Sequence, residues 1–202
     1  MPESMSRSVA HDAVSLIAEL AVYARCWPDE AESAAQFSAL LDDGHDPFVR
    51  DRVAGHFTAS AWLVDRSGTR VLLTHHRKLQ RWLQLGGHAD GDRDLPQVAL
   101  REAQEESGLG GLRVERDLFD IDRHWIPERG DVPGHWHYDA RYVVHAGVDE
   151  NYVVSEESHD LAWRGIAAVV DDPHADASLR RMGMKWLMRS DGHDSGASVS
   201  PI

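Results

Sequence analysis

Apolar side chains recur at helical spacing between residues 9 and 26, which predicts an amphipathic helix near the start of the chain. The residues that repeat are Val9, Ala13, Leu16, Ile17, Leu20 and Ala24. Pro28 interrupts this pattern and suits the first turn of a second helix, which we expect to continue to about Leu41. We therefore expect residues 1–50 to form a helical extension that packs on the rest of the chain or across a homodimer.

From Phe57 the pattern changes to short apolar runs bounded by turn residues, which indicates strands. The elements expected after this point are strands at Phe57–Val64, Val71–Thr74, Trp82–Leu85, Val114–Asp122 and His137–Ala146, and helices at Leu95–Ser107 and Ala177–Arg189. Strands interspersed with helices predict an α/β fold over residues 51–190, with a mixed sheet between helices. Residues 191–202 have the composition of a linker, so we expect them to form a mobile tail.

Composition and charge narrow the classes of protein that fit. The 202 residues carry a formal net charge of −13 and no run of lysine or arginine, which argues against a DNA-binding protein. No apolar run is long enough to span a membrane, and we expect no secretory signal in the first residues. Cys26 is the single cysteine, so no intramolecular disulfide is expected and the cytoplasm is the expected location.

Three glutamates stand at positions i, i+3 and i+4 of the predicted helix over residues 95–107. Glu102, Glu105 and Glu106 therefore share one helix face. Their charges repel one another unless a cation lies among them, and ligands that offer only oxygen favour Mg²⁺ or Mn²⁺. A solvated acidic face has the same pattern, so the helix alone leaves both interpretations open.

A longer motif surrounds these glutamates. The run Arg101-Glu102-Ala103-Gln104-Glu105-Glu106-Ser107-Gly108-Leu109 resembles the REUxEExGU half of the Nudix box, in which U is a bulky aliphatic residue. Gly87 stands at the position of the first glycine of that box. The glutamate expected six residues later falls on Arg93 instead, and Asp92 is the candidate replacement. Residues 156–163 also resemble a segment that commonly follows the box, which extends the resemblance over roughly residues 56–165.

This resemblance implies a Nudix fold and a metal-dependent hydrolase. The expected substrate is a nucleoside diphosphate linked to another group, whose diphosphate bond is cleaved with Mg²⁺ or Mn²⁺ as the cofactor. The metal ligands that the resemblance implies are Glu102 and Glu106, assisted by Glu105 and the carbonyl of Gly86. Arg101 is expected to orient these carboxylates. Two candidates remain for the general base, Glu105 and Glu157.

Histidines form a second group of candidate residues. If residues 135–142 form a strand, one of its faces carries His135, His137, Asp139 and Arg141, and the other carries Trp136, Tyr138 and Tyr142. One interpretation is a polar wall in which His135, His137 and Arg141 bind substrate while Asp139 orients His137. An exposed hairpin face is an equal alternative. His88 directly follows Gly86-Gly87 and is also expected to bind substrate, whereas His56 is expected to be a surface or core residue.

Two other functions share the same fold. An isomerase of the isopentenyl-diphosphate type carries a cysteine in the triplet that Gly86-Gly87-His88 resembles, and this chain has glycine there. A non-catalytic, nucleotide-binding Nudix domain often lacks box glutamates, and this chain keeps Glu102, Glu105 and Glu106. Hydrolysis of a diphosphate bond is therefore the favoured interpretation.

Overall fold

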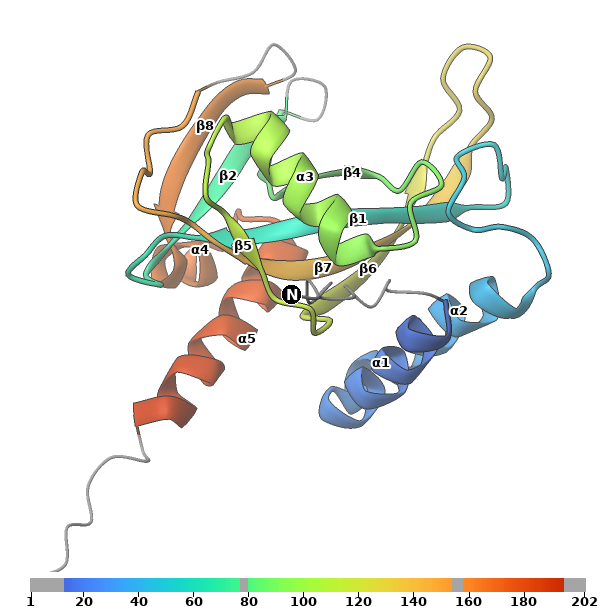
Figure 1. Cartoon of the computed structure of the whole chain (residues 1–202), viewed down its shortest axis with the longest axis horizontal. Coiled ribbons are helices and arrows are strands. Elements are labelled where there is room, and N and C mark those ends of the chain that lie inside the picture. Colours follow the sequence, from blue (N-terminus) through green and yellow to red (C-terminus); the bar gives the residue numbers. More distant parts are fainter. Residues whose placement is uncertain (1–12, 77–79, 154–157, 195–202) are drawn as a thin grey trace, which may run out of the picture.

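The computed structural model describes residues 13–76, 80–153 and 158–194, which form one mixed sheet with helices on both faces (Figure 1). The helices are α1 (Ala13–Cys26), the short 3₁₀ helix η1 (Pro28–Glu30), α2 (Ala31–Asp42), α3 (Leu95–Ser107), α4 (Ile166–Asp171) and α5 (Ala177–Asp194). The strands are β1 (His56–Val64), β2 (Arg70–His76), β3 (Arg81–Leu83), β4 (Leu85–His88), β5 (Arg113–Val114), β6 (Asp120–Ile126), β7 (His135–His145) and β8 (Ser158–Gly165). Most of the expected tail, residues 195–202, lies outside the described part.

Strand β1 occupies the centre of the sheet and is buried along its whole length. It pairs in parallel with β7, from His56 opposite His137 to Val64 opposite His145. On its other side it pairs antiparallel with β4 and, at its end, with β2. The sheet order is β3-β2-β1-β7-β5, with β8 on β2 and β6 on β7. The mixed sheet expected from the sequence is therefore confirmed.

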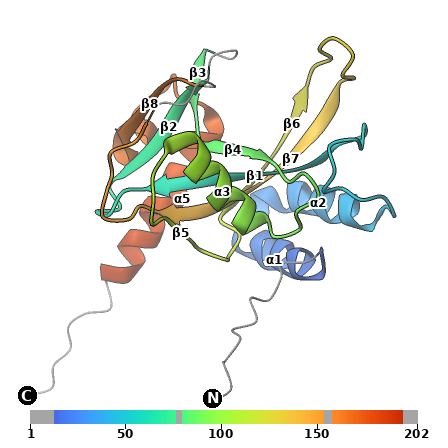
Figure 2. The ribbon, with the colours of Figure 1, turned by 45° about the horizontal axis from the view of Figure 1, so that its top comes forward.

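Successive side chains of β1 point to opposite faces of the sheet. Phe57 and Ala59 belong to an apolar cluster with residues of α1, α2 and α3. Trp62 and Val64 belong to a different cluster, with residues of α4 and α5. Figures 1 and 2 show these two helical layers on the two sides of the sheet. The position of each residue in β1 therefore determines which helical layer it faces.

The N-terminal helices pack on the core of their own chain. Leu16 and Leu20 of α1 and Phe37 of α2 are almost completely buried. The ring of Phe37 lies 5.8 Å from that of Phe57 in β1, measured between centroids. Burial of a large apolar side chain contributes about 1.5–3 kcal/mol, so these contacts hold the extension on the sheet. Among the described residues, no helix is both long and apolar enough to cross a membrane.

Helix α3 begins and ends where the sequence predicts. The side chain of Asp94 accepts a hydrogen bond from the backbone N–H of Gln97, and Pro96 occupies the first turn, where no N–H is required. Gly108 ends the helix in the left-handed conformation, with a φ of 69°, which glycine adopts without steric cost. The local sequence therefore determines both ends of this helix.

Other elements differ from the expectation. The strand expected at Val114–Asp122 is two strands, β5 and β6, and the strand expected at Trp82–Leu85 is divided into β3 and β4. Strand β8 and helix α4 were not expected as separate elements. The two divisions have different causes: β3 pairs with β2 while β4 pairs with β1, whereas β5 and β6 pair with separate parts of the same strand, β7. Hydrophobic pattern alone does not indicate a change of partner.

A buried network of ion pairs joins the sheet to α5 and to the N-terminal helices. Its centre is Asp120 of β6, which is fully buried. Its carboxylate accepts hydrogen bonds from Arg141 at 3.1 Å, from Arg181 at 2.8 Å and 3.0 Å, and from Lys185 at 2.6 Å. These cations hold the pKa of Asp120 below its ordinary value, against the opposing effect of burial. Lys185 also pairs with Glu30 at 2.7 Å, so the network reaches η1.

The structure corrects the expected role of Arg141. This residue was expected to bind a substrate phosphate, but its side chain is 2% exposed. Its guanidinium pairs with three carboxylates, those of Asp120, Asp122 and Asp139. Arg141 lies opposite Ser60 in the register, which places it on the face of α5 and not on the face that α3 covers. Its charge is used to neutralise buried aspartates, so it stabilises the fold.

We predict that Arg141→Ala lowers the free energy of unfolding by about 3–5 kcal/mol, because it leaves buried carboxylates without their cation. Urea denaturation of the purified variant measures this loss. Arg81→Ala is the matched control, since Arg81 is 56% exposed and pairs with Asp176 at the surface. The control should lose at most about 1 kcal/mol. Equal, small losses in both variants would show that the network contributes little.

Candidate functional site

The glutamates of α3 lie against the two glycines of β4. The carboxylate of Glu106 accepts a hydrogen bond of 2.9 Å from the backbone N–H of Gly86. A Cβ atom built on Gly87 would lie 2.3 Å from Oε2 of Glu102, so a larger residue at this position would displace that carboxylate. Gly87 lies opposite Ala59 of β1, on the face that α3 covers. The motif glycines thus permit the acidic face of the helix to approach the strand.

Arg101 connects the loop before α3 to the glutamates. Its guanidinium donates to Asp92 at 3.3 Å and lies 3.5 Å from Oε1 of Glu102. The expected approach of Asp92 to Arg101 is confirmed, as a replacement for the missing box glutamate requires. Both groups are partly exposed, with side-chain exposures of 36% and 37%, so this pair contributes little to the stability of the fold.

The environment of Glu102 suits a divalent cation. Burial raises the pKa of its carboxyl group, Arg101 opposes this shift, and the negative charge of Glu105 adds to it. A cation close to Glu102 would offset both the cost of burying its charge and the repulsion from Glu105. Glu102, Glu106 and a backbone carbonyl of β4 offer only oxygen atoms, the ligand type that Mg²⁺ and Mn²⁺ prefer. The residues present therefore fit the metal that the motif implies.

Only one of the two candidates for the general base lies in the described part of the chain. Glu105 is exposed on α3, between Glu102 and Glu106 in the sequence. Glu157 lies outside the described residues. Of the two, the structure therefore places only Glu105.

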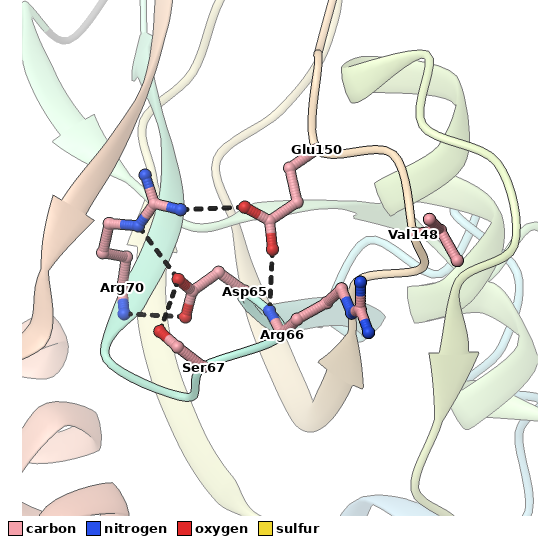
Figure 3. A pocket seen from close by; sticks show the side chains of 6 residues that line it. All are labelled: Asp65, Arg66, Ser67, Arg70, Val148 and Glu150. Carbon is pink, nitrogen blue, oxygen red and sulfur yellow. Dashed lines mark hydrogen bonds and ion pairs between the residues drawn. The ribbon is translucent and has the colours of Figure 1, made fainter.

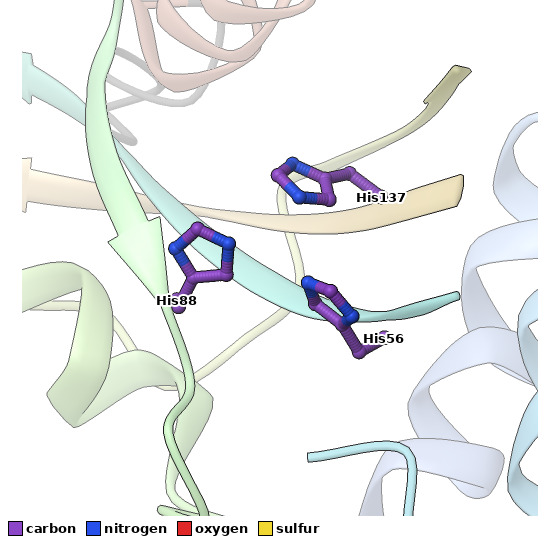
Figure 4. Close-up of side chains that lie close together, drawn as sticks. All are labelled: His56, His88 and His137. Atoms are coloured by element: carbon purple, nitrogen blue, oxygen red, sulfur yellow. The ribbon is translucent and has the colours of Figure 1, made fainter. Parts of the chain in front are cut away.

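The histidines form a cluster on the other face of the sheet (Figure 4). His137 lies opposite His56 of β1 and opposite His124 of β6, so three neighbouring strands each contribute one ring to a row. His88 of β4 adds to this row, with its ring centroid 5.2 Å from that of His56 and 4.9 Å from that of His137. His135 stacks on His56 at 4.9 Å. The structure therefore brings together His88, His135 and His137, which the sequence suggested separately.

Burial keeps the imidazoles of His56, His88 and His137 neutral. It is the main cause that lowers the pKa of His88 to about 4 and that of His137 to about 2. Neighbouring charges lower both values further, chiefly Arg50 for His88 and His88 itself for His137. The pKa of His56 is lowered as well, for the same main reason. Neutral imidazoles have a free nitrogen lone pair, so the cluster presents several acceptor atoms at neutral pH.

Asp139 does not have its expected role of orienting His137. Its carboxylate accepts hydrogen bonds from Thr58 at 3.0 Å, from Ser60 at 2.8 Å and from Arg141 at 2.8 Å. These donors use the carboxylate oxygens, and Asp139 therefore belongs to the buried network. Residue His137 instead contacts His135, with their Nε2 atoms 3.2 Å apart.

The most important residue that sequence reasoning missed is His56. Its position at the start of a strand is visible in the sequence, but its partners are 32 and 81 positions away, at His88 and His137. Only the pairing of β1 with β4 and β7 brings these side chains together. The repeated histidines of residues 135–137 are the one local signal of such a cluster.

Gly86 has no room for the side chain that the isomerase alternative requires. A Cβ atom at this position would lie 2.3 Å from Oγ of Ser60 and 2.7 Å from the carbonyl oxygen of Ala59. Backbone atoms of the central strand cannot move aside as a flexible side chain can. The packing of β4 on β1 therefore disfavours a cysteine at position 86.

A shallow hollow of about 580 Å³ lies at the turn between β1 and β2 (Figure 3). Its charged side chains pair with one another: Arg70 with Asp65 at 2.9 Å and with Glu150 at 2.8 Å. Glu150 also accepts a hydrogen bond from the backbone N–H of Arg66. The turn follows the end of β1, whereas the histidine cluster lies at its beginning. We therefore assign no chemistry to this hollow.

Comparison with known proteins agrees with the motif. The family model described as "NUDIX domain" matches residues 55–186. None of the curated proteins matches the chain. The structure is similar to that of a hydrolase of the NUDIX family from Clostridium perfringens, with a TM-score of 0.50 and 25% identity over 66% of this chain and 97% of the other.

Two further solved structures share the fold at lower identity. The first is the C. elegans Ap4A hydrolase in a binary complex, with a TM-score of 0.53 and 17% identity over 67% of this chain and 98% of that one. The second is the E. coli dihydroneopterin triphosphate pyrophosphohydrolase, with a TM-score of 0.52 and 16% identity over 66% of this chain and 95% of that one. These similarities support the α/β arrangement of the sheet and its helices.

We predict that Gly87→Ala weakens binding of Mn²⁺ by roughly 10–100-fold, because the added methyl group displaces the carboxylate of Glu102. Titration followed by electron paramagnetic resonance measures the affinity. Gly110→Ala is the matched control, since a Cβ atom at Gly110 meets nothing within 4 Å. Circular dichroism should show both variants folded. Unchanged Mn²⁺ affinity in Gly87→Ala would contradict a role for this close approach.

Proposed function

Since this chain belongs to the NUDIX domain family, we propose that it is a hydrolase that cleaves a diphosphate bond in a nucleoside diphosphate linked to another group, with Mg²⁺ or Mn²⁺ as its cofactor. The observation that carries this proposal is the contact of α3 with β4. Glu102 fills the space that Gly87 leaves open, and Glu106 is held by the N–H of Gly86. Both carboxylates therefore lie beside the backbone of Gly86 and Gly87.

Each residue of this arrangement has a separate task in the proposal. Glu102 and Glu106 hold the divalent cation, assisted by Glu105 and the carbonyl of Gly86. When bound, the cation neutralises phosphate charge and lowers the pKa of water, which makes a nucleophile available at neutral pH. Arg101 keeps Glu102 oriented through its contacts with Glu102 and Asp92. Glu105, exposed beside this group, accepts the proton from the attacking water.

An assay panel identifies which compound of this class is the substrate. By their names, two of the structurally similar proteins act on Ap4A and on dihydroneopterin triphosphate, which are different compounds. The panel that distinguishes the possibilities consists of ADP-ribose, a nucleotide sugar, a dinucleoside polyphosphate and a nucleoside triphosphate, each with Mg²⁺ or Mn²⁺. Chromatography of the products identifies which diphosphate bond is cleaved.

We predict that Glu106→Gln reduces kcat by at least about a hundredfold on whichever panel compound is cleaved, because a Lewis-acid cation contributes several kcal/mol to such a reaction. Excess EDTA should abolish the activity of the unmodified protein. Glu32→Gln, a change at an exposed glutamate of α2, is the control and should have normal activity. Turnover that continues in EDTA, or equal activity of Glu106→Gln and Glu32→Gln, would exclude this mechanism.

We predict that Glu105→Gln lowers kcat by about 10²–10⁴-fold while KM changes little, because the residue acts on a proton and not on substrate binding. The same measurements on Glu157→Gln provide the comparison. If Glu105→Gln is fully active and Glu157→Gln is not, the general base is Glu157 and our assignment of Glu105 is wrong.

A further inference from the structure

Three of the clustered histidines are arranged as ligands for a transition-metal ion. One nitrogen each of His56, His88 and His137 can be chosen so that all three lie within 4.8 Å of one another. A point between them is then at most about 2.8 Å from each nitrogen, and a Zn–N bond is roughly 2.0–2.1 Å long. Each ring therefore has to move by only about 0.7 Å, which small side-chain rotations provide. Figure 4 shows the three rings converging on one space from β1, β4 and β7.

The hydrogen bonds at the edge of the cluster indicate which ring nitrogens carry a proton. Nδ1 of His56 lies 3.4 Å from the carbonyl oxygen of Arg52, and Nδ1 of His135 lies 2.8 Å from that of Pro133. A carbonyl oxygen only accepts, so each of these Nδ1 atoms carries the proton and each Nε2 atom has a lone pair. Histidines that bind metals commonly donate their other N–H to a backbone carbonyl in this way.

His56 provides an independent observation that points to a ligand. Its side chain is almost completely buried, with 2% of the residue exposed. Its Nε2 atom has no hydrogen-bond partner. A buried polar atom without a partner costs about 1–3 kcal/mol, and native proteins rarely leave one in that condition. A metal ion at the point of convergence would use this atom.

A positive charge that acts on this cluster is already compensated. The guanidinium of Arg50, which acts on both His56 and His88, is held by Asp90. Its Nε and one terminal nitrogen donate to the two carboxylate oxygens at 2.6 Å and 2.5 Å. This bidentate pair limits the repulsion that Arg50 would exert on a cation among the histidines.

We propose that His56, His88 and His137 bind a transition-metal ion such as Zn²⁺, with His135 beside them as the hydrogen-bonding partner of His137. This site is separate from the oxygen site of the proposed hydrolase in both ligand type and position. Imidazole nitrogens suit Zn²⁺, whereas carboxylates and carbonyls suit Mg²⁺ and Mn²⁺. Gly87 and His88 are consecutive in β4, so they point to opposite faces of the sheet. An ion on the histidines would join β1, β4 and β7 and would hold the glycines of β4 in place against α3.

Binding of Co²⁺, a spectroscopic substitute for Zn²⁺, tests the proposal without reference to activity. The full chain is stripped of metal and titrated with Co²⁺ in excess Mg²⁺, which occupies oxygen ligands. We expect one Co²⁺ per chain, with visible absorption bands of a nitrogen-ligated ion. The bands should disappear when Zn²⁺ is added as a competitor, and Zn²⁺ should raise Tm by linkage.

Variants locate the ion. His137→Gln and His88→Gln should each weaken Co²⁺ binding by at least about a hundredfold, because loss of a ligand costs no less than loss of its supporting partner. Two matched variants should keep the bands: His145→Gln, which changes the last residue of the same strand β7, and Glu106→Gln, which changes the oxygen site. Since His88 is only partly buried, His88→Gln remains informative if His137→Gln fails to fold.

Two results would overturn the proposal. One is the absence of stoichiometric Co²⁺ and Zn²⁺ binding in excess Mg²⁺. The other is binding that survives in His88→Gln and His137→Gln but is lost in Glu106→Gln, which would place the ion on the glutamates. The readout is independent of the substrate panel, so an inactive enzyme that binds Co²⁺ through its histidines would contradict the proposed hydrolase and support this site.

Discussion

The parallel pairing of β1 with β7 determines which residues of this protein meet. It runs in register over the nine residues of β1, from His56 to Val64. Because side chains alternate along both strands, each pair of opposite residues is assigned to one of two layers. On one face, small and aromatic residues of the two strands pack against α1, α2 and α3. The other face carries polar pairs in its first half and the apolar contacts of α4 and α5 in its second half.

The same alternation separates the carboxylates of α3 from the histidines and from the buried ion pairs. Gly87 directs its open side toward Glu102, while the next residue, His88, joins the histidines on the opposite face. Further along β7, Arg141 neutralises the buried Asp120 and Asp139. The carboxylates of α3 are therefore separated by the thickness of the sheet from the imidazoles and the buried ion pairs, which occupy different positions on its other face. An oxygen site and a nitrogen site can exist side by side without sharing ligands.

Much of the fold was predictable, because it depends on local signals. The bounds of α3 follow from Asp94, Pro96 and Gly108, whose effects reach only a few residues. The strands at β1 and β7 follow from continuous apolar runs and alternation. The division between β3 and β4 was not predictable because it arises from a change of pairing partner, and the division between β5 and β6 because it arises from an interruption in their pairing with β7.

For the candidate site, the sequence by itself determined the acidic face of α3 and the glycines before it, because helical periodicity and the absence of a Cβ atom are properties of a single segment. Tertiary structure alone decided which groups surround the polar residues of β7. Arg141 and His137 have the same parity in one strand, yet one is enclosed among aspartates and the other contacts histidines. Their surroundings come from β1, β4, β6 and α5, which are distant in sequence. The sequence specifies the charge and the hydrogen-bonding capacity of a side chain. Whether that side chain contributes to stability or to binding depends on the partners that the fold brings to it.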